Sequence, residues 1–223
     1  MMKTRTYFFL ILLFLGFLQS QAQTTKNPFS ADIRRFQQID FAHPPKPNSI
    51  LFYGSSSFRM WTDVQEYFPD FPIINRGFGG SKLTDLILFR DEIVFPYQPR
   101  QIVIYCGEND FADNDTLLPA AVTDRFIQLF GLIRKRLPDV QISYISMKPS
   151  PSRWHLAGKF AEANLGIEKF LEEQTNTAYI DIWDKMLNKR QMPDSALFLE
   201  DMLHMKPEGY QLWQKEIETH LLK

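Results

Sequence analysis

Five short apolar runs recur along the chain, each ending at turn-prone residues. They cover residues 50–53, 72–74, 101–105, 140–145 and 178–182. Each run is three to six residues long and is rich in Ile, Val, Tyr or Phe. Such runs are typical of strands that are buried on both faces of a parallel sheet. The pattern therefore predicts a parallel sheet with buried strands.

Stretches of helical spacing separate these runs. Apolar side chains three or four residues apart form one stripe at Val122, Phe126, Phe130, Ile133 and Leu137, and another at Tyr210, Trp213, Ile217 and Leu221. Pro207 precedes the second stripe and suits the first turn of a helix, where its missing N–H has no partner to lose. Strands that alternate with helices predict an α/β protein, a three-layer α/β/α sandwich around the sheet. No long repeat is visible, so we expect a single domain over residues 49–223.

The first 48 residues do not show the alternation of predicted strands and helices. Lys3 and Arg5 precede an uncharged stretch at 7–18, and Ser20-Gln21-Ala22 forms a small-x-small cleavage site. Residues 1–22 are therefore predicted to be a signal peptide cleaved near Ala22, because the apolar stretch is shorter than the roughly 20 residues a membrane span needs. Residues 23–48 are polar and rich in proline, which predicts an extended arm over the surface. We expect a secreted or periplasmic protein without a stable membrane anchor.

Charge and cysteine content exclude several classes of function. The chain has 25 Lys and Arg against 26 Asp and Glu, so it offers no strongly basic surface and nucleic acid is an unexpected partner. With one cysteine it makes neither an internal disulfide nor a cysteine-based zinc site.

Four segments carry chemistry, and the first two follow predicted strands. Residues 54–57 read Gly-Ser-Ser-Ser, which suits a nucleophile at the start of a helix, although serines that only cap the helix would look the same. Residues 75–80 read Asn-Arg-Gly-Phe-Gly-Gly, and their glycines let the backbone approach a ligand or form an ordinary flexible loop.

The other two segments supply an amide, a carboxylate and an imidazole. Residues 107–110 read Gly-Glu-Asn-Asp, and the amide of Asn109 suits an oxyanion, although an Asn-Asp turn would look the same. Asp201 and His204 stand three residues apart before the last helix. A carboxylate at this spacing fixes the tautomer of the histidine and leaves its other nitrogen to take a proton from a serine.

Taken together, these segments resemble the SGNH hydrolases, also called the GDSL esterase/lipase superfamily. The marks of that family are matched here by Ser56, Gly80, Asn109 and the Asp201/His204 pair, over residues 50–209. The sequence of residues 75–80 is most similar to that of the branch related to platelet-activating-factor acetylhydrolases. The resemblance implies a flavodoxin-like sheet of five parallel strands and no metal or organic cofactor.

The resemblance also implies roles for these residues. Ser56 is the nucleophile, His204 the base and Asp201 the residue that orients it, with Ser55 and Ser57 as alternative nucleophiles. The oxyanion hole consists of the Ser56 and Gly80 N–H groups and the Asn109 side chain. One position departs from the family, because Ser55 stands where the family has an aspartate.

The sequence points less directly to the substrate. An acidic, exported esterase is expected to act on short acyl groups, above all O-acetyl groups on carbohydrate. Arg153 and Trp154, in a proline-rich segment after the fourth predicted strand, are candidate substrate-binding residues. The alternatives are a lysophospholipase or thioesterase that uses the same residues, a non-catalytic carbohydrate-binding module, and a metal site at Asp110, Asp201 and His204.

Overall fold

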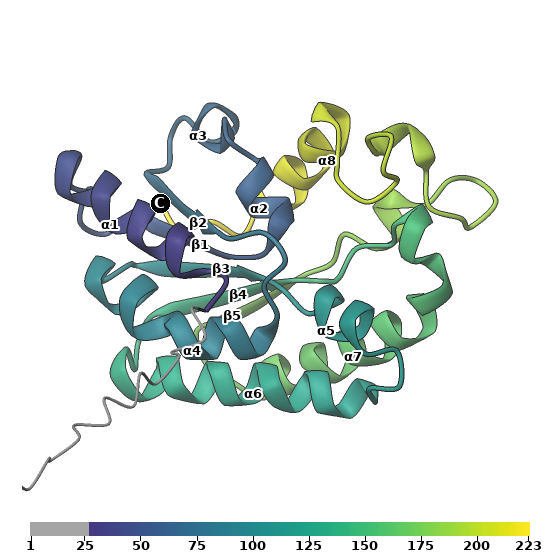
Figure 1. Cartoon of the computed structure of the whole chain (residues 1–223), viewed down its shortest axis with the longest axis horizontal. Coiled ribbons are helices and arrows are strands. Elements are labelled where there is room, and N and C mark those ends of the chain that lie inside the picture. The colour runs from purple at the N-terminus through teal and green to yellow at the C-terminus, as the bar shows by residue number, and fades with distance from the viewer. Residues whose placement is uncertain (1–26) are drawn as a thin grey trace, which may run out of the picture.

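The computed structural model describes residues 27–223, and its core is one parallel sheet of five strands (Figure 1). The strands are β1 (Ile50–Gly54), β2 (Ile73–Gly77), β3 (Gln101–Tyr105), β4 (Gln141–Ile145) and β5 (Thr177–Ile180). They pair in the order β2-β1-β3-β4-β5. This is the flavodoxin-like order, which confirms the predicted fold class. The direction of winding reverses between β1 and β3, and sites in such sheets lie beyond the carboxyl ends of the strands at that point.

Helices cover both faces of the sheet. They are α1 (Ser30–Ala42), α2 (Ser56–Met60), α3 (Val64–Tyr67), α4 (Leu83–Ile93), α5 (Glu108–Asp113), α6 (Pro119–Arg136), α7 (Ala157–Glu172) and α8 (Pro207–Glu218). Short 3-10 helices are η1 (Phe95–Tyr97), η2 (Pro151–Leu156), η3 (Asp184–Met186) and η4 (Ser195–Leu197). Figure 1 shows α4, α6 and α7 below the sheet and α2, α3 and α8 above it. The predicted apolar stripes lie on α6 and α8, except that Leu137 and Leu221 follow the ends of these helices, and Pro207 is the first residue of α8.

Alternation along the strands divides the core into two layers. Leu51 and Tyr53 of β1 pack with the layer of α4, α6 and α7, whereas Ile50 and Phe52 pack with the layer of α2, α3 and α8. All five residues of β1 are buried. Nearly half of the buried residues in the second layer are aromatic, and the Trp61 ring stacks on Tyr210 with centroids 4.7 Å apart. This stacking joins the short segment after β1 to the last helix.

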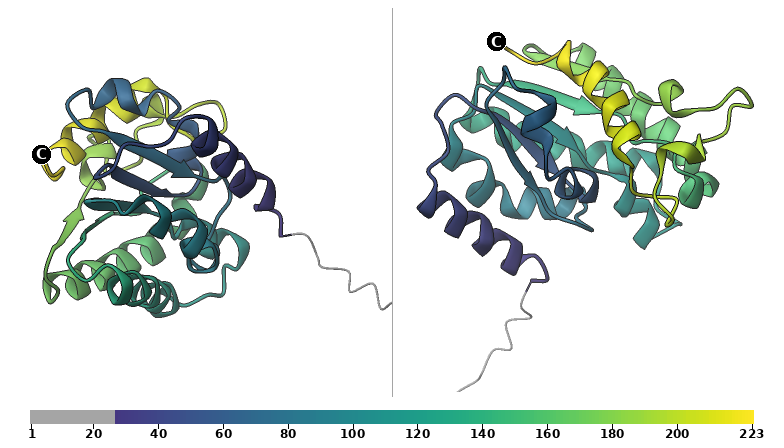
Figure 2. Two further views of the ribbon diagram at one scale, coloured as in Figure 1. Left: turned by 90° about the vertical axis from the view of Figure 1, so that its left-hand side faces the viewer. Right: turned by 90° about the horizontal axis from the view of Figure 1, so that it is seen from above.

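The predicted arm at 23–48 is wrong where the structure describes it, because residues 30–42 form α1 (Figure 2). Ile33 and Phe36 lie one turn apart and are buried in the core. The prolines at 44, 45 and 47 stand beyond the helix end, so they do not interrupt it. Arg76 of β2 pairs with Asp40, which ties α1 to the edge strand of the sheet. The predicted signal peptide at 1–22 lies outside the described residues.

The second glycine segment begins inside a strand rather than after one. β2 continues to Gly77, which lies opposite Gly54 of β1. A Cβ at Gly77 would lie 2.4 Å from the backbone nitrogen of Arg59. The glycine at 77 is therefore required for the close packing of α2 on β2, and only Gly79 and Gly80 remain for the loop beyond the strand.

Among residues 27–223, no helix combines the length and the apolar character that crossing a bilayer would need.

Candidate active site

The turn from β1 into α2 holds three consecutive serines in different environments. The side chains of Ser55 and Ser57 are buried, at 4% and 1% exposure, whereas Ser56 is half-buried. Ser55 is the N-cap of α2, and Ser56 is the first helical residue. The N–H of a first helical residue has no acceptor within its own helix. Ser56 is thus the serine that combines a reachable hydroxyl with a free backbone donor.

Ser55 and Ser57 are each held by a neighbouring side chain. Asn109 Nδ2 donates to Ser55 Oγ at 2.8 Å, so the hydroxyl at the position of the family aspartate contacts the predicted oxyanion residue. Lys148 Nζ donates to Ser57 Oγ at 3.3 Å. Both hydroxyls therefore serve local structure in this state.

Lys148 and Glu108 form a buried ion pair beneath the turn. The ammonium of Lys148 contacts both carboxylate oxygens of Glu108 at 3.2 and 3.1 Å and the Tyr105 hydroxyl at 3.2 Å. Lys148 is 1% exposed and Glu108 6%. Burial lowers the pKa of Lys148, and the nearby Glu108 acts in the opposite direction. A buried pair of this kind is stable only while both partners are present, because the loss of one leaves an uncompensated charge.

Gly80 lies in the exposed loop between β2 and α4. Its φ of 84° is in the left-handed region, which glycine adopts without strain, and no heavy atom lies within 4 Å of the position of a Cβ. The next residue, Ser81, is buried, and its hydroxyl contacts the Gly54 carbonyl at 3.4 Å. The loop is thereby held beside the end of β1.

Asn109, in the first turn of α5, contacts three segments of the chain. Its amide nitrogen donates to Ser55 Oγ and, at 3.0 Å, to the Ser81 carbonyl. Its amide oxygen accepts from Arg153 at 2.8 Å. The Arg153 guanidinium, predicted to contact substrate, is here engaged on Asn109.

The structure brings Asp201 and His204 together in one tight turn. Asp201 Oδ2 lies 2.5 Å from His204 Nδ1, and Oδ1 accepts from the backbone N–H groups of Leu203 and His204 at 2.9 Å each. Met202, between them, has a φ of 55°, which is uncommon for a residue with a side chain. Desolvation acts to raise the pKa of Asp201, but the hydrogen bonds from His204 and Leu203 prevail and lower it to about 2.

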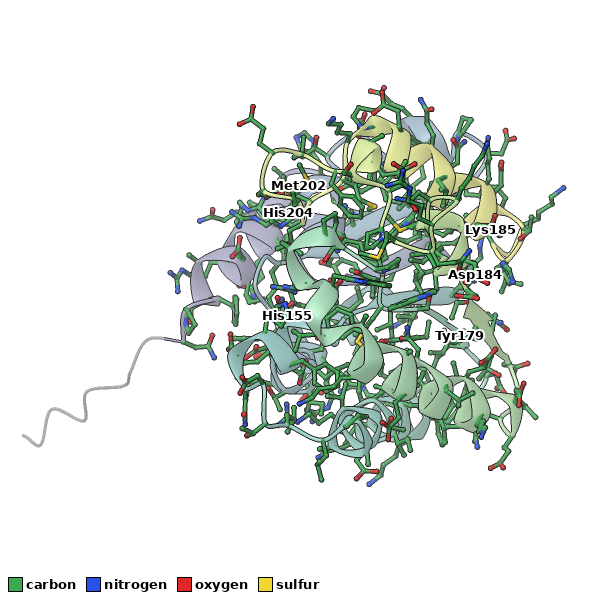
Figure 3. All side chains as sticks on the ribbon, turned by 90° about the vertical axis from the view of Figure 1, so that its right-hand side faces the viewer. His155, Tyr179, Asp184, Lys185, Met202 and His204 are labelled. Atoms are coloured by element: carbon green, nitrogen blue, oxygen red, sulfur yellow. The ribbon has the colours of Figure 1, made fainter. Side chains whose placement is uncertain are left out.

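A chain of contacts joins this turn to the other segments. The Ser152 N–H donates to the Met202 carbonyl at 3.1 Å, and the adjacent Arg153 contacts Asn109. From the opposite side, the Tyr210 hydroxyl of α8 donates to the Ser57 carbonyl at 2.8 Å. Figure 3 views the molecule from the side on which the strands end and shows His204 beside Met202. These contacts link the four predicted segments indirectly, with the Asp201–His204 turn joined to Asn109 through residues 152 and 153. Among residues 27–223, no hydrogen bond joins His204 to Ser56.

Trp154 has a partner that sequence reasoning missed. Its indole lies beside that of Trp183, with centroids 6.1 Å apart and planes inclined by 32°. Both residues are half-buried. Trp183 directly follows the fifth apolar run, and its position after a strand is the signal that would have identified it. The Lys148–Glu108 pair was also missed, since 40 residues separate its members.

The sequence profile of the GDSL-like lipase/acylhydrolase family matches residues 48–212. The chain belongs to that family. Membership implies hydrolase activity on acyl substrates. Among curated proteins, none matches this chain in sequence.

Several solved structures share this fold. A GDSL-like lipase from Bacteroides thetaiotaomicron superposes with a TM-score of 0.72 at 19% identity, covering 85% of this chain and 97% of that one. A protein from Streptococcus pneumonia, proposed to be a platelet activating factor, gives 0.76 at 18% identity over 86% and 92%. The acetyl xylan esterase AlAXEase gives 0.64 at 16% identity over 78% and 100%. At these identities the likeness establishes the fold alone.

The GDSL-like site does not gather ligands for a metal ion within residues 27–223, where no group of three or more His, Cys, Asp or Glu side chains is suitably placed. Asp110, the third residue of the alternative metal site, is buried and accepts from the Leu83 N–H at 3.0 Å and from Arg125 at 2.5 Å. Its carboxylate therefore joins α5 to α4 and α6.

Proposed function

We propose that this GDSL-like protein is a serine esterase that removes short acyl groups, with O-acetyl groups on carbohydrate as its substrate class. One observation carries the proposal: Asp201 occupies Nδ1 of His204, which leaves Nε2 as the nitrogen available to a serine. Of the three serines at the turn from β1 into α2, Ser56 is the one that is neither buried nor held by a neighbouring side chain.

In the proposed reaction, Ser56 Oγ attacks the carbonyl carbon of the ester while His204 Nε2 takes its proton. Asp201 stabilises the imidazolium that forms. The tetrahedral intermediate then collapses, and His204 passes the proton to the departing alcohol, which leaves an acyl group on Ser56. Water attacks this acyl-enzyme with the same assistance from His204 and releases the acid.

Three donors would hold the oxyanion. The Ser56 N–H lacks a helical acceptor, and the open loop at Gly80 leaves its backbone accessible. Asn109 Nδ2 already lies one residue from Ser56, where it contacts the Ser55 hydroxyl. Because one amide proton is bound to a neutral hydroxyl, it can be redirected to an oxyanion, which is the stronger acceptor.

Two features support a carbohydrate ester. The Trp154–Trp183 pair offers half-buried indole surface next to Arg153, which contacts Asn109. The acetyl xylan esterase that shares this fold acts on an acetylated polysaccharide by its name. An apolar stretch followed by a small-x-small sequence at 7–22 supports action outside the cytoplasm, where such polymers occur.

The proposal is tested by a series of p-nitrophenyl esters together with acetylated xylo-oligosaccharide. We expect kcat/KM to fall from acetyl to butyryl to palmitoyl and acetate to be released from the oligosaccharide. A kcat/KM that rises with the length of the acyl group would instead support a lysophospholipase or thioesterase. Absence of turnover, together with absence of labelling by a fluorophosphonate, would indicate a non-catalytic carbohydrate-binding module.

Replacing Trp154 by alanine tests the carbohydrate contact separately. An aromatic contact contributes about 0.5–1.5 kcal/mol beyond its buried area, so KM for the acetylated oligosaccharide should rise roughly two- to tenfold. KM for p-nitrophenyl acetate should not change, because this substrate carries no sugar. An equal rise for both substrates would show that Trp154→Ala disturbs the site itself.

A further inference from the structure

The carboxamide of Asn109 is oriented by two partners of opposite hydrogen-bonding character. The Ser81 carbonyl can only accept, and it lies 3.0 Å from Nδ2. The Arg153 guanidinium can only donate, and it lies 2.8 Å from Oδ1. A flipped amide would oppose oxygen to oxygen and N–H to N–H, so the two partners together fix the orientation in which Nδ2 faces the serine turn.

Arg153 is itself held in place. Its side chain is 17% exposed, and its Nη1 lies 4.0 Å from the carboxylate of Glu108. Glu108 in turn is bound by Lys148, which lies in the same connection between β4 and α7 as Arg153 and is almost fully buried. The guanidinium therefore approaches Asn109 from a fixed position beside a buried ion pair.

A cation on the amide oxygen changes what the amide nitrogen can do. A charge-assisted hydrogen bond is shorter and stronger than a neutral one, and bonds in series polarise one another. Withdrawal of electron density toward Oδ1 makes the Nδ2 protons of Asn109 better donors. The donor is thus strengthened without contact between Arg153 and the reacting atoms.

We propose that Arg153 is a positioning residue, which orients the Asn109 amide and strengthens it as an oxyanion donor. As a kinetic statement this rests on the proposed esterase function, in which Asn109 contacts the oxyanion. It differs from a substrate contact of Arg153, because the effect would pass through Asn109 and would not depend on the alcohol part of the ester.

The kinetic test is a double-mutant cycle with p-nitrophenyl acetate. Arg153→Met should lower kcat by about tenfold, the equivalent of one charge-assisted hydrogen bond, and change KM less than about twofold. Arg153→Lys, which keeps the charge, should recover part of the loss. In Asn109→Ala, where the target is absent, Arg153→Met should have no further effect. Equal losses in both backgrounds, or a rise in KM alone, would overturn the proposal.

The orientation of the amide can also be measured without turnover. In a ¹⁵N-correlated spectrum of the full chain, the Asn109 side-chain signals are assigned by their absence from Asn109→Ala. They should shift in Arg153→Met, shift less in Arg153→Lys, and stay in place in Arg35→Met, a control on α1. Unchanged signals in folded Arg153 variants would overturn the positioning role. If the signals shift in Arg153→Met but the wild type hydrolyses no ester, the proposed esterase function is refuted and the orienting contact stands.

Discussion

Replacement of Ser56 by alanine is expected to reduce kcat on p-nitrophenyl acetate by roughly 10⁴–10⁶, the loss typical when the nucleophile of a cooperating triad is removed. This expectation rests on the environment of Ser56 and of the two serines beside it. Ser56 is half-buried at the first position of α2, whereas the side chains on either side of it are buried and hydrogen-bonded. Initial rates and fluorophosphonate labelling measure the effect, and both should be lost together.

The neighbouring serines provide matched controls for this substitution. Ser57→Ala removes a hydroxyl that contacts Lys148, and Ser55→Ala removes one that contacts Asn109. Each should cost at most about tenfold in kcat, the scale of one hydrogen bond. If Ser56→Ala kept wild-type activity while one of these variants lost labelling, the nucleophile would be assigned to that neighbour.

The second large effect is expected from Asp201→Asn, which should lower kcat by about 10⁴. The carboxylate holds Nδ1 of His204 at 2.5 Å, and an asparagine can present its amide N–H there, which stabilises the wrong tautomer. Glu200→Gln is the control, since it neutralises the adjacent exposed carboxylate. Wild-type activity in Asp201→Asn would remove this pair from the mechanism.

The pH dependence of the Asp201 contact follows from its lowered pKa. The pKa falls from 3.8 to about 2 in the folded chain, so the stabilisation it provides is complete above about pH 4 and is lost as pH falls through about 2. If the measured activity of the wild type falls between pH 7 and pH 4, the group whose protonation causes the loss is therefore not Asp201.

The architecture was largely readable from the sequence because each strand is buried on both faces and each helix on one. The predicted strand boundaries differ from the observed ones by at most three residues, and those of β3 agree at both ends. Helices α6 and α8 also lie where their apolar stripes predict. The region before β1 was predicted to be an extended arm because it is rich in proline, although Ile33 and Phe36 have the one-turn spacing of a helix. The burial of these two side chains depends on α4 and the sheet, which composition does not reveal.

The sequence predicts the segments of the candidate site but not the contacts that join them. Sequence reasoning named Asp201 and His204 as partners, and their spacing within one turn is enough to explain why. It could not show that Arg153 meets Asn109, 44 residues away, or that Lys148 meets Ser57, 91 residues away. Such contacts depend on how loops at the ends of different strands fold over one another, and no local pattern encodes them.

The order of these parts along the chain has a consequence for biosynthesis. The β1 turn with its serines leaves the ribosome before the Asp201–His204 turn and before α8, whose Tyr210 contacts Ser57. A nascent polypeptide that has not yet reached residue 201 therefore carries the candidate nucleophile without its candidate base. We therefore expect esterase activity to appear only after the chain has been extended through the Asp201–His204 turn and α8.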